Sequence, residues 1–301
     1  MTFRTAFFGL ACAALATPAL AFDLDGVKTR VLNGLEGPLG PHNISNVPIA
    51  NAPLAAEGLD QIAGYTLRTR SWTISGDTGT VPLHSHADRP AIVFTLNGEI
   101  FEIRSDTKGR ILHRAGGLSL EHGDVTHLWR NEGPQHVRLI AFDVFKARRA
   151  APVADRPLAQ GFDLPAQSGA RLDLLGVVDI EGHYDGAKGA GLALSAYRAV
   201  IEPGGVLPSF VGPGAPLQIW VWQGAVTQHR SDAGAGAPVT LATEAGAHLG
   251  GGAQAYWENT GAVPAEVFFG VVEPLSETVG VPQVGVQAHH GTEWATPFQE
   301  G

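Results

Sequence analysis

The chain contains one module that occurs twice, and this internal repeat limits the fold more than any other feature. The matching positions are turn glycines, prolines and a charged tripeptide; at an offset of 126 residues, Gly79, Pro82, Pro90, Gly98 and Arg104-Ser105-Asp106 match Gly205, Pro208, Pro216, Gly224 and Arg230-Ser231-Asp232. After a two-residue insertion the offset becomes 128, and Gly123, Trp129, Asn131 and Gly133 match Gly251, Trp257, Asn259 and Gly261. An ordered series of this kind indicates two copies of one structural unit.

The composition favours short strands joined by tight turns. The 301 residues include 39 glycines and 20 prolines, and only 16% of all residues are charged. Helical periodicity is scarce, whereas residues 92–96, 137–144 and 217–222 are short apolar runs of the kind that form buried strands. We therefore predict an all-β fold.

Three histidines have a spacing that suits a metal site. His84 and His86 are two residues apart, so on a β-strand both imidazoles point to the same face. His127 follows 41 residues after His86, which allows it to return on a distant strand. Imidazole binds zinc, copper, iron and nickel, and three such ligands leave positions open for substrate or oxygen. Ordinary histidines held by hydrogen bonds are the alternative, and the surrounding sequence decides between the two.

That surrounding sequence resembles the two motifs of the cupin superfamily. Residues 79–98, which contain His84 and His86, are similar to the first motif, and residues 117–131, which contain His127, are similar to the second. The resemblance implies an antiparallel β-barrel of the double-stranded β-helix, or jelly-roll, type with a metal held by these three histidines in its mouth. Combined with the repeat, it implies a bicupin, with two such barrels in one chain.

The chain departs from the cupin motifs at two positions that affect the ligand set. Ala91 stands where the family has a glutamate, and Glu121 replaces the usual proline of the second motif, with one extra residue before His127. We therefore expect a three-histidine site without a carboxylate at the usual place. A carboxylate from elsewhere is the alternative, and Glu102 is a candidate because the second copy has Gln228 at the matching position.

Glu102 and His122 are the candidate catalytic residues, each as an acid or base beside the metal ligands. Glu102 could equally be a solvated strand residue, and His122 could be a fourth ligand or a plain loop histidine. Arg104 and Asp106 recur in the second copy, so we expect them to form a structural pair. The other histidines match no motif position and are expected to be ordinary surface or core residues: His42, His113, His136, His183, His229, His248, His289 and His290.

The second copy lacks the metal ligands. Its residues at the three histidine positions are Phe210, Gly212 and Ala255, none of which binds a cation. We therefore predict one divalent metal ion per chain and a mainly structural role for the second barrel, which would cover the first. An empty apolar barrel that binds a ligand is the alternative.

The N-terminus has the pattern of a secretory signal peptide. Residues 1–21 contain one positive charge at Arg4, a short apolar run and small residues before a cleavage point predicted after Ala21. We therefore predict a periplasmic or secreted protein. Cys12, the single cysteine, lies in this segment, so the mature protein would have no disulfide.

The predicted domain boundaries follow from the repeat and from a polar, proline-interrupted connection. They are a signal peptide over 1–21, an N-terminal metal-binding cupin with an N-terminal arm over 22–150, a linker over 151–160, a degenerate C-terminal cupin over 161–280 and a tail over 281–301. A formal net charge of −9 argues against nucleic acid and anionic membrane surfaces as partners. The expected partner is a small-molecule substrate, and a homodimer is left open.

The predicted function is an exported, metal-dependent cupin enzyme that acts on a small organic molecule. Three-histidine iron sites in cupins are typical of thiol, diketone and gentisate-type dioxygenases, so the resemblance favours a non-haem Fe(II) dioxygenase. Manganese, zinc and nickel are the alternative metals. A lyase, hydrolase or isomerase of the same fold, or a binding protein without enzymatic activity, is the alternative function.

Overall fold

The computed structural model describes residues 26–54, 59, 62, 64–107, 109–146, 162–184, 191–212, 215–232, 237–250 and 252–275. Within these ranges the chain forms strands β1 to β19 and short 3₁₀ turns but no α-helix, which confirms the all-β prediction. No helix in this part of the chain is long and apolar enough to cross a membrane. Three predicted segments lie outside the described residues: the signal peptide 1–21, the linker 151–160 and the tail 281–301.

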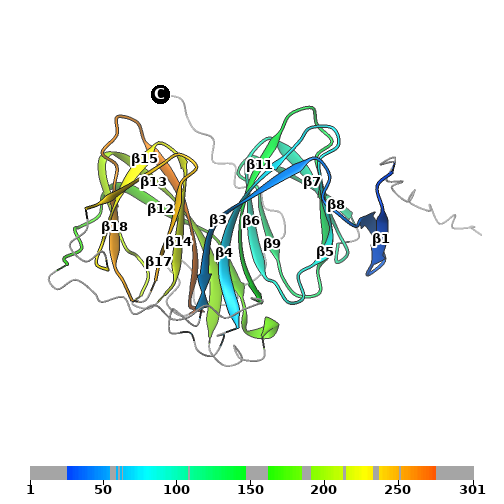
Figure 1. The fold of residues 1–301 in the computed structure, drawn as a ribbon, viewed down its shortest axis with the longest axis horizontal. Helices are drawn as coiled ribbons and strands as arrows, with labels where there is room; N and C mark the ends of the chain where they lie inside the picture. Colours follow the sequence, from blue (N-terminus) through cyan, green and yellow to red (C-terminus); the bar gives the residue numbers. More distant parts are fainter. Residues whose placement is uncertain are drawn as a thin grey trace, which may run out of the picture.

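The first barrel consists of two antiparallel sheets that enclose the candidate site (Figure 1, right). One sheet has the order β5 (Thr80–Ser85), β10 (Thr126–Arg130), β7 (Glu99–Arg104), β8 (Gly109–Arg114). The other has the order β3 (Ile44–Pro53), β4 (Tyr65–Ile74), β11 (Val137–Lys146), β6 (Ala91–Asn97), β9 (Leu118–Glu121). A hairpin of β1 (Thr29–Leu32) and β2 (Leu35–Pro38) lies at the outer edge of this barrel.

The second barrel repeats this arrangement in one continuous eight-stranded antiparallel sheet (Figure 1, left). Its long strand β13 takes the place of β4 and β5 together, and β12 pairs along it. The strands are β12 (Ser168–Asp179), β13 (Leu192–Pro208), β14 (Leu217–Gln223), β15 (Ala225–Arg230), β16 (Val239–Ala242), β17 (Gly246–Leu249), β18 (Ala255–Glu258) and β19 (Ala265–Pro274). The prediction of two antiparallel barrels in one chain is confirmed.

Strand β11, which lies between the barrels, is largely apolar on both faces because each face contributes to a different core. In β11, Leu139 and Ala141 belong to the core inside the first barrel, whereas Ile140 and Phe142 belong to a core shared with the second barrel. Phe268 of β19 lies in the same shared core. Since successive side chains on a strand alternate between faces, a continuous apolar run is what such a doubly buried strand requires.

The two barrels pack so closely that glycine is required at the contact. A Cβ atom at Gly270 would overlap the ring of Phe142, and one at Gly246 would overlap Ile49 of β3. The N-terminal arm therefore lies against the second barrel through β3 while pairing with β4 of the first. The second barrel covers the outer face of the sheet that contains β3, β4, β11, β6 and β9. A mainly structural role for this barrel stays a prediction.

Candidate metal centre

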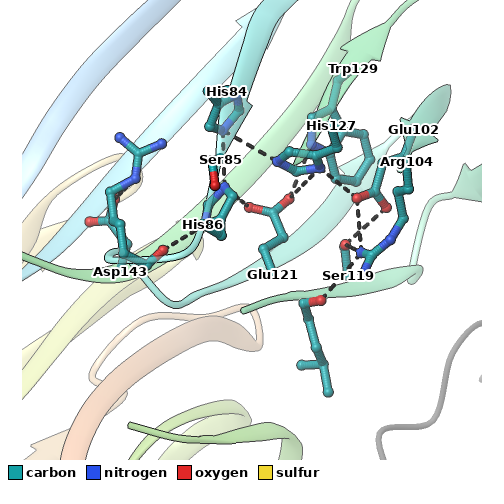
Figure 2. Close-up of polar contacts among 12 residues, drawn as sticks. His84, Ser85, His86, Glu102, Arg104, Ser119, Glu121, His127, Trp129 and Asp143 are labelled. Carbon is teal, nitrogen blue, oxygen red and sulfur yellow. Dashed lines mark hydrogen bonds and ion pairs between the residues drawn. The ribbon is translucent and has the colours of Figure 1, made fainter. Parts of the chain in front are cut away.

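Four side chains direct ligand atoms to one point inside the first barrel (Figure 2). His84 lies on β5, His86 directly follows that strand, Glu121 ends β9 and His127 lies on β10. The Nε2 atom of His84 is 3.0 Å from Nε2 of His86 and 3.3 Å from Nε2 of His127. Oε2 of Glu121 is 3.1 Å from Nε2 of His86. Ligand atoms around one ion with bonds of about 2.1 Å are about 3.0–3.4 Å apart, so this spacing fits a single divalent metal.

The proton positions on two of the imidazoles follow from their outer partners. Nδ1 of His84 is 2.7 Å from the carbonyl oxygen of Pro82, and Nδ1 of His86 is 2.6 Å from that of Arg89. A carbonyl oxygen can only accept, so each Nδ1 carries the proton and each Nε2 presents a lone pair to the centre. Two lone pairs 3.0 Å apart repel each other unless a cation or proton lies between them. Outer hydrogen bonds of this kind are typical of histidines that bind metals.

The ionisation of the group also favours a cation at the centre. Burial lowers the pKa of His84 and His86 well below 6.5, so both are neutral, as metal ligands must be. Burial also opposes protonation of His127, but Glu121 and Glu102 together outweigh that effect and raise its pKa. Burial raises the pKa of Glu121. A bound cation would replace the proton that these carboxylates otherwise attract and would stabilise the ionised form of Glu121.

Glu121 is the ligand candidate that the sequence analysis missed. Ala91 and Glu121 are direct cross-strand partners in β6 and β9, so both side chains lie on the same face of the sheet. The Trp129 Nε1–H donates to Oε1 of Glu121 at 3.1 Å, while Oε2 lies beside His86. The usual place holds no carboxylate, as expected, but a carboxylate from elsewhere joins the three histidines. It comes from Glu121 and not from the expected candidate Glu102, so the group that could hold a metal ion consists of His84, His86, His127 and Glu121.

Glu102 lies behind His127 and is not among the converging ligand atoms (Figure 2). Its Oε1 accepts from Nδ1 of His127 at 2.6 Å and from Arg104 at 3.0 Å. Its Oε2 accepts from Nε2 of His113 and from the Ser119 hydroxyl, both at 2.9 Å. Burial alone would raise the pKa of Glu102, but the hydrogen bonds from His113 and His127 outweigh it and keep the carboxylate ionised. Glu102 therefore orients His127. His113, which was expected to be an ordinary histidine, belongs to this network.

His122 also lies outside the ligand group. Its ring centroid is 6.2 Å from that of His183, which ends the 3₁₀ turn η3 (Glu181–His183) of the second half, and the rings are nearly perpendicular. Nδ1 of His183 is 3.2 Å from the carbonyl oxygen of Ala87, one residue past His86. The structure thus places His122 where the two halves meet, and a catalytic role for it stays a prediction.

Arg104 and Asp106 form the structural pair that their recurrence predicted. The Arg104 guanidinium donates to both carboxylate oxygens of Asp106 at 3.0 and 2.9 Å. Arg230 and Asp232 repeat this bidentate pair at 2.7 and 2.6 Å in the half without ligands. The pair therefore accompanies the fold and does not depend on a metal.

A small cavity opens beside the ligand group. Its volume is about 30 Å³, and His84, His86 and Glu121 form part of its wall. Arg70 contributes a cation to that wall. The remaining wall is mostly apolar and includes Trp72, Val81, Val93, Leu139 and Ala141.

The second barrel has lost the complete ligand group. The pair Leu217 and Leu249 occupies the same register in β14 and β17 as Ala91 and Glu121 in the first barrel. Phe210, at the position of His84, packs its ring against two other aromatic rings, those of Tyr197 and Phe269. The four ligand positions thus hold Phe210, Gly212, Leu249 and Ala255.

The network around Glu102 has disappeared together with the ligands. The matching residue Gln228 lies opposite Val239, as Glu102 lies opposite Ile111. The positions of His113 and Ser119 hold Leu241 and Ala247. Loss of supports and ligands together indicates that these supports serve the centre and not the barrel.

No protein-family model matches the chain, and no curated protein matches its sequence. Among solved structures, the putative glyoxylate-induced protein from Pseudomonas aeruginosa matches with a TM-score of 0.51 at 14% identity over 80% of this chain and 83% of that one. An oxalate decarboxylase from Lactobacillus farciminis matches with a TM-score of 0.49 at 13% identity, over 83% and 85% of the two chains. A salicylate 1,2-dioxygenase from Pseudaminobacter salicylatoxidans matches with a TM-score of 0.44 at 12% identity, over 68% and 70%. At identities this low the matches show only the fold. The chain has the two-domain cupin fold that its motifs predicted.

Proposed function

We propose that this protein is a metal-dependent enzyme that holds a divalent ion with His84, His86, Glu121 and His127 and acts on a small organic molecule. The observation that carries the proposal is the convergence of three Nε2 atoms and one carboxylate oxygen beside a cavity (Figure 2). Ions that take six ligands, such as iron or manganese, would keep two positions for substrate or oxygen. When bound, the ion supplies Lewis-acid activation and, in the case of iron, electrons for oxygen chemistry.

The residues around the ion would each have a separate task. Glu121 supplies one negative charge next to the histidines, which reduces the net charge of a divalent centre. Glu102 holds His127 by its Nδ1–H, which fixes the ring and strengthens Nε2 as a donor. Because Glu102 is completely buried and has four hydrogen bonds, it positions His127 and does not touch the substrate.

Among reactions, we favour an oxygen-dependent oxidation of the dioxygenase type with iron as the metal. The apolar wall formed by Val81, Val93, Leu139 and neighbouring residues supports this choice. Such a wall admits dioxygen, a small apolar molecule, and excludes the water that would compete for reactive species. The tightness of the cavity favours a small substrate over a large one.

Metal analysis followed by oxygen consumption tests the proposal. The protein as isolated is expected to contain about one iron per chain and to consume oxygen with members of a panel of small diketones, thiols and organic acids. His84→Ala should abolish both metal and activity, whereas His136→Ala, which changes an exposed histidine of the same barrel, should abolish neither. If the protein contained one zinc per chain and took up no oxygen, Lewis-acid chemistry would replace oxidation as the proposed reaction. A metal content near zero, even after reconstitution, would contradict the proposal itself.

We also propose that the protein is exported, on the basis of residues 1–21. The N-terminal sequence of the protein from a periplasmic or secreted fraction should begin at Phe22. A chain that keeps Met1 and stays in the cytoplasmic fraction would contradict the proposal.

A further inference from the structure

Three arginines surround one buried aspartate inside the first barrel. The Arg68 guanidinium donates to both oxygens of Asp143 at 2.9 and 2.5 Å, and Nη2 of Arg70 donates to Oδ2 at 2.9 Å. Nε of Arg89 lies 3.9 Å from the same oxygen. The side chain of Asp143 is fully buried, and those of the arginines are largely so. Three positive charges and one negative charge leave an excess of positive charge in this cluster.

Two hydrogen-bond donors of the cluster also lack an acceptor. The buried Nε–H groups of Arg70 and Arg89 have no hydrogen-bond acceptor among the described residues. An unpaired buried donor is costly, and more so on a charged group. Burial also lowers the pKa of Arg70 to about 10, because Asp143 compensates its charge only in part. Both features leave these arginines with the capacity to bind a further anion.

The place for that anion is next to the candidate metal centre. Arg70 lines the cavity whose wall also contains His84, His86 and Glu121. Arg89 is linked to the centre directly, since its carbonyl oxygen accepts from Nδ1 of His86. A small anion in the cavity could therefore contact the arginine cluster while another part of the same molecule faces the ligand atoms.

The second barrel provides an internal comparison, because its strands can be matched to the first by equivalent hydrogen bonds. Nδ2 of Asn131 donates to the carbonyl oxygen of Ile74 at 3.1 Å, and Nδ2 of Asn259 donates to that of Ile201 at 2.7 Å. These bonds align β4 with the first part of β13. In both barrels the strand continues without a bulge along its partner, β11 or β19.

In that alignment the arginine cluster is absent from the barrel without metal ligands. The positions of Arg68, Arg70, Arg89 and Asp143 hold Ser195, Tyr197, Ala215 and Val271. The pair of Arg104 and Asp106, by contrast, persists in both barrels. A cluster needed only for the fold would be expected to persist in the same way, so the arginines belong with the site.

We propose that Arg70, with Arg68 and Arg89 held around Asp143, binds a carboxylate group of the substrate. This inference rests on the proposed function, because the other end of the substrate would face the metal. It names small organic acids as the substrate class. The planar fork of a guanidinium suits a carboxylate, and a pre-positioned arginine would turn the substrate so that one end faces the ligand atoms.

The experiment is a titration with acetate and propionate and, as neutral counterparts, acetamide and propionamide, followed by saturation-transfer NMR. It is carried out on both metal-loaded and metal-stripped protein. Acids should bind and amides should not, including in the metal-stripped sample. Arg70→Gln should weaken acid binding at least about tenfold without changing metal content, because a charge-assisted hydrogen bond is lost. Arg110→Gln, which changes an arginine paired with Glu132 outside the cavity, should have no effect.

Each outcome separates the carboxylate site from the metal centre. Unchanged acid binding by a folded Arg70→Gln protein would overturn the inference and leave the proposed function intact. If the protein binds no metal at all, the proposed function fails, while the titration of the same sample still tests Arg70. Should Arg70→Gln not fold, the wild-type protein decides: equal binding of acetate and acetamide by the metal-stripped sample would overturn the inference.

Discussion

Ala91 and Glu121 face each other across strands β6 and β9, so the carboxylate beside the three histidines comes from the strand opposite the usual position. The side chains of such partners start about 4.5–5.5 Å apart on one face of the sheet. A glutamate on β9 can therefore reach the ligand group that Ala91, with its single methyl, cannot. The two departures from the cupin motifs, at Ala91 and Glu121, therefore amount to moving one carboxylate from β6 to β9.

The exchange predicts that the carboxylate can be moved back. Glu121→Ala should lower metal affinity by more than about tenfold, since losses in outer-sphere partners alone reach 10–100-fold. The double variant Ala91→Glu with Glu121→Ala should regain part of that affinity. Metal titration of the stripped proteins measures both effects. Wild-type affinity in a folded Glu121→Ala protein would exclude Glu121 as a ligand.

Glu102 should affect the metal through His127. Glu102→Gln keeps an oxygen near Nδ1 of His127 but removes the charge, so metal affinity should fall roughly tenfold, at the lower end of the range for such partners. Glu99→Gln on the same strand, where Glu99 pairs with the exposed Arg114, is the matched control and should bind metal normally. An effect larger than that of Glu121→Ala would mean that the roles of the two glutamates are reversed.

The asymmetry of the two barrels predicts one metal per chain. His84→Ala and His127→Ala should each empty the site and abolish activity while preserving the β-type circular dichroism spectrum, because strand pairing and the two cores hold the barrels closed. Structural metals are needed mainly where a domain is too small to build a core. Two metals per chain, or loss of the whole spectrum in either variant, would contradict this prediction.

The sequence predicted the two barrels because turn glycines and continuous apolar runs can be recognised in short stretches of the chain. It also located three ligands, since the spacing of His84 and His86 determines a shared face. Glu121 was missed because its partner across the sheet depends on strand register, which spacing along the chain does not determine. A signal was present, however: the second copy has Leu249 where the first has Glu121, in parallel with the loss of the histidines.

The arginine cluster was missed for a related reason. Arg68 and Arg70 precede the first motif and Asp143 follows the second, so no motif joins them. Only the antiparallel pairing of β4 with β11, which sets Arg68 opposite Asp143, makes them neighbours. Comparison of the two copies position by position, with strand register as the guide, would have revealed the cluster.

Asp143 should stabilise the protein in a pH-dependent way. Burial would raise its pKa, but Arg70 and Arg68 outweigh burial and hold the pKa below the ordinary value of 3.8. A carboxyl whose pKa is lowered in the folded state stabilises that state above its unfolded pKa, and the contribution is lost as the pH falls through the folded pKa. Asp143→Asn should therefore cost about 3–5 kcal/mol near pH 7, because it leaves buried arginines without their counter-charge.

This cost should stay constant above about pH 5 and shrink as the pH falls below about 4, where the wild-type carboxyl takes up its proton. Thermal unfolding of both proteins between pH 3 and 7 measures the difference. Asp173→Asn, which removes the exposed partner of Arg171, is the control and should cost less than about 1 kcal/mol at any of these pH values. A difference between wild type and Asp143→Asn that grows as the pH falls would mean that the aspartate is protonated in the folded protein and that the arginines have another counter-charge.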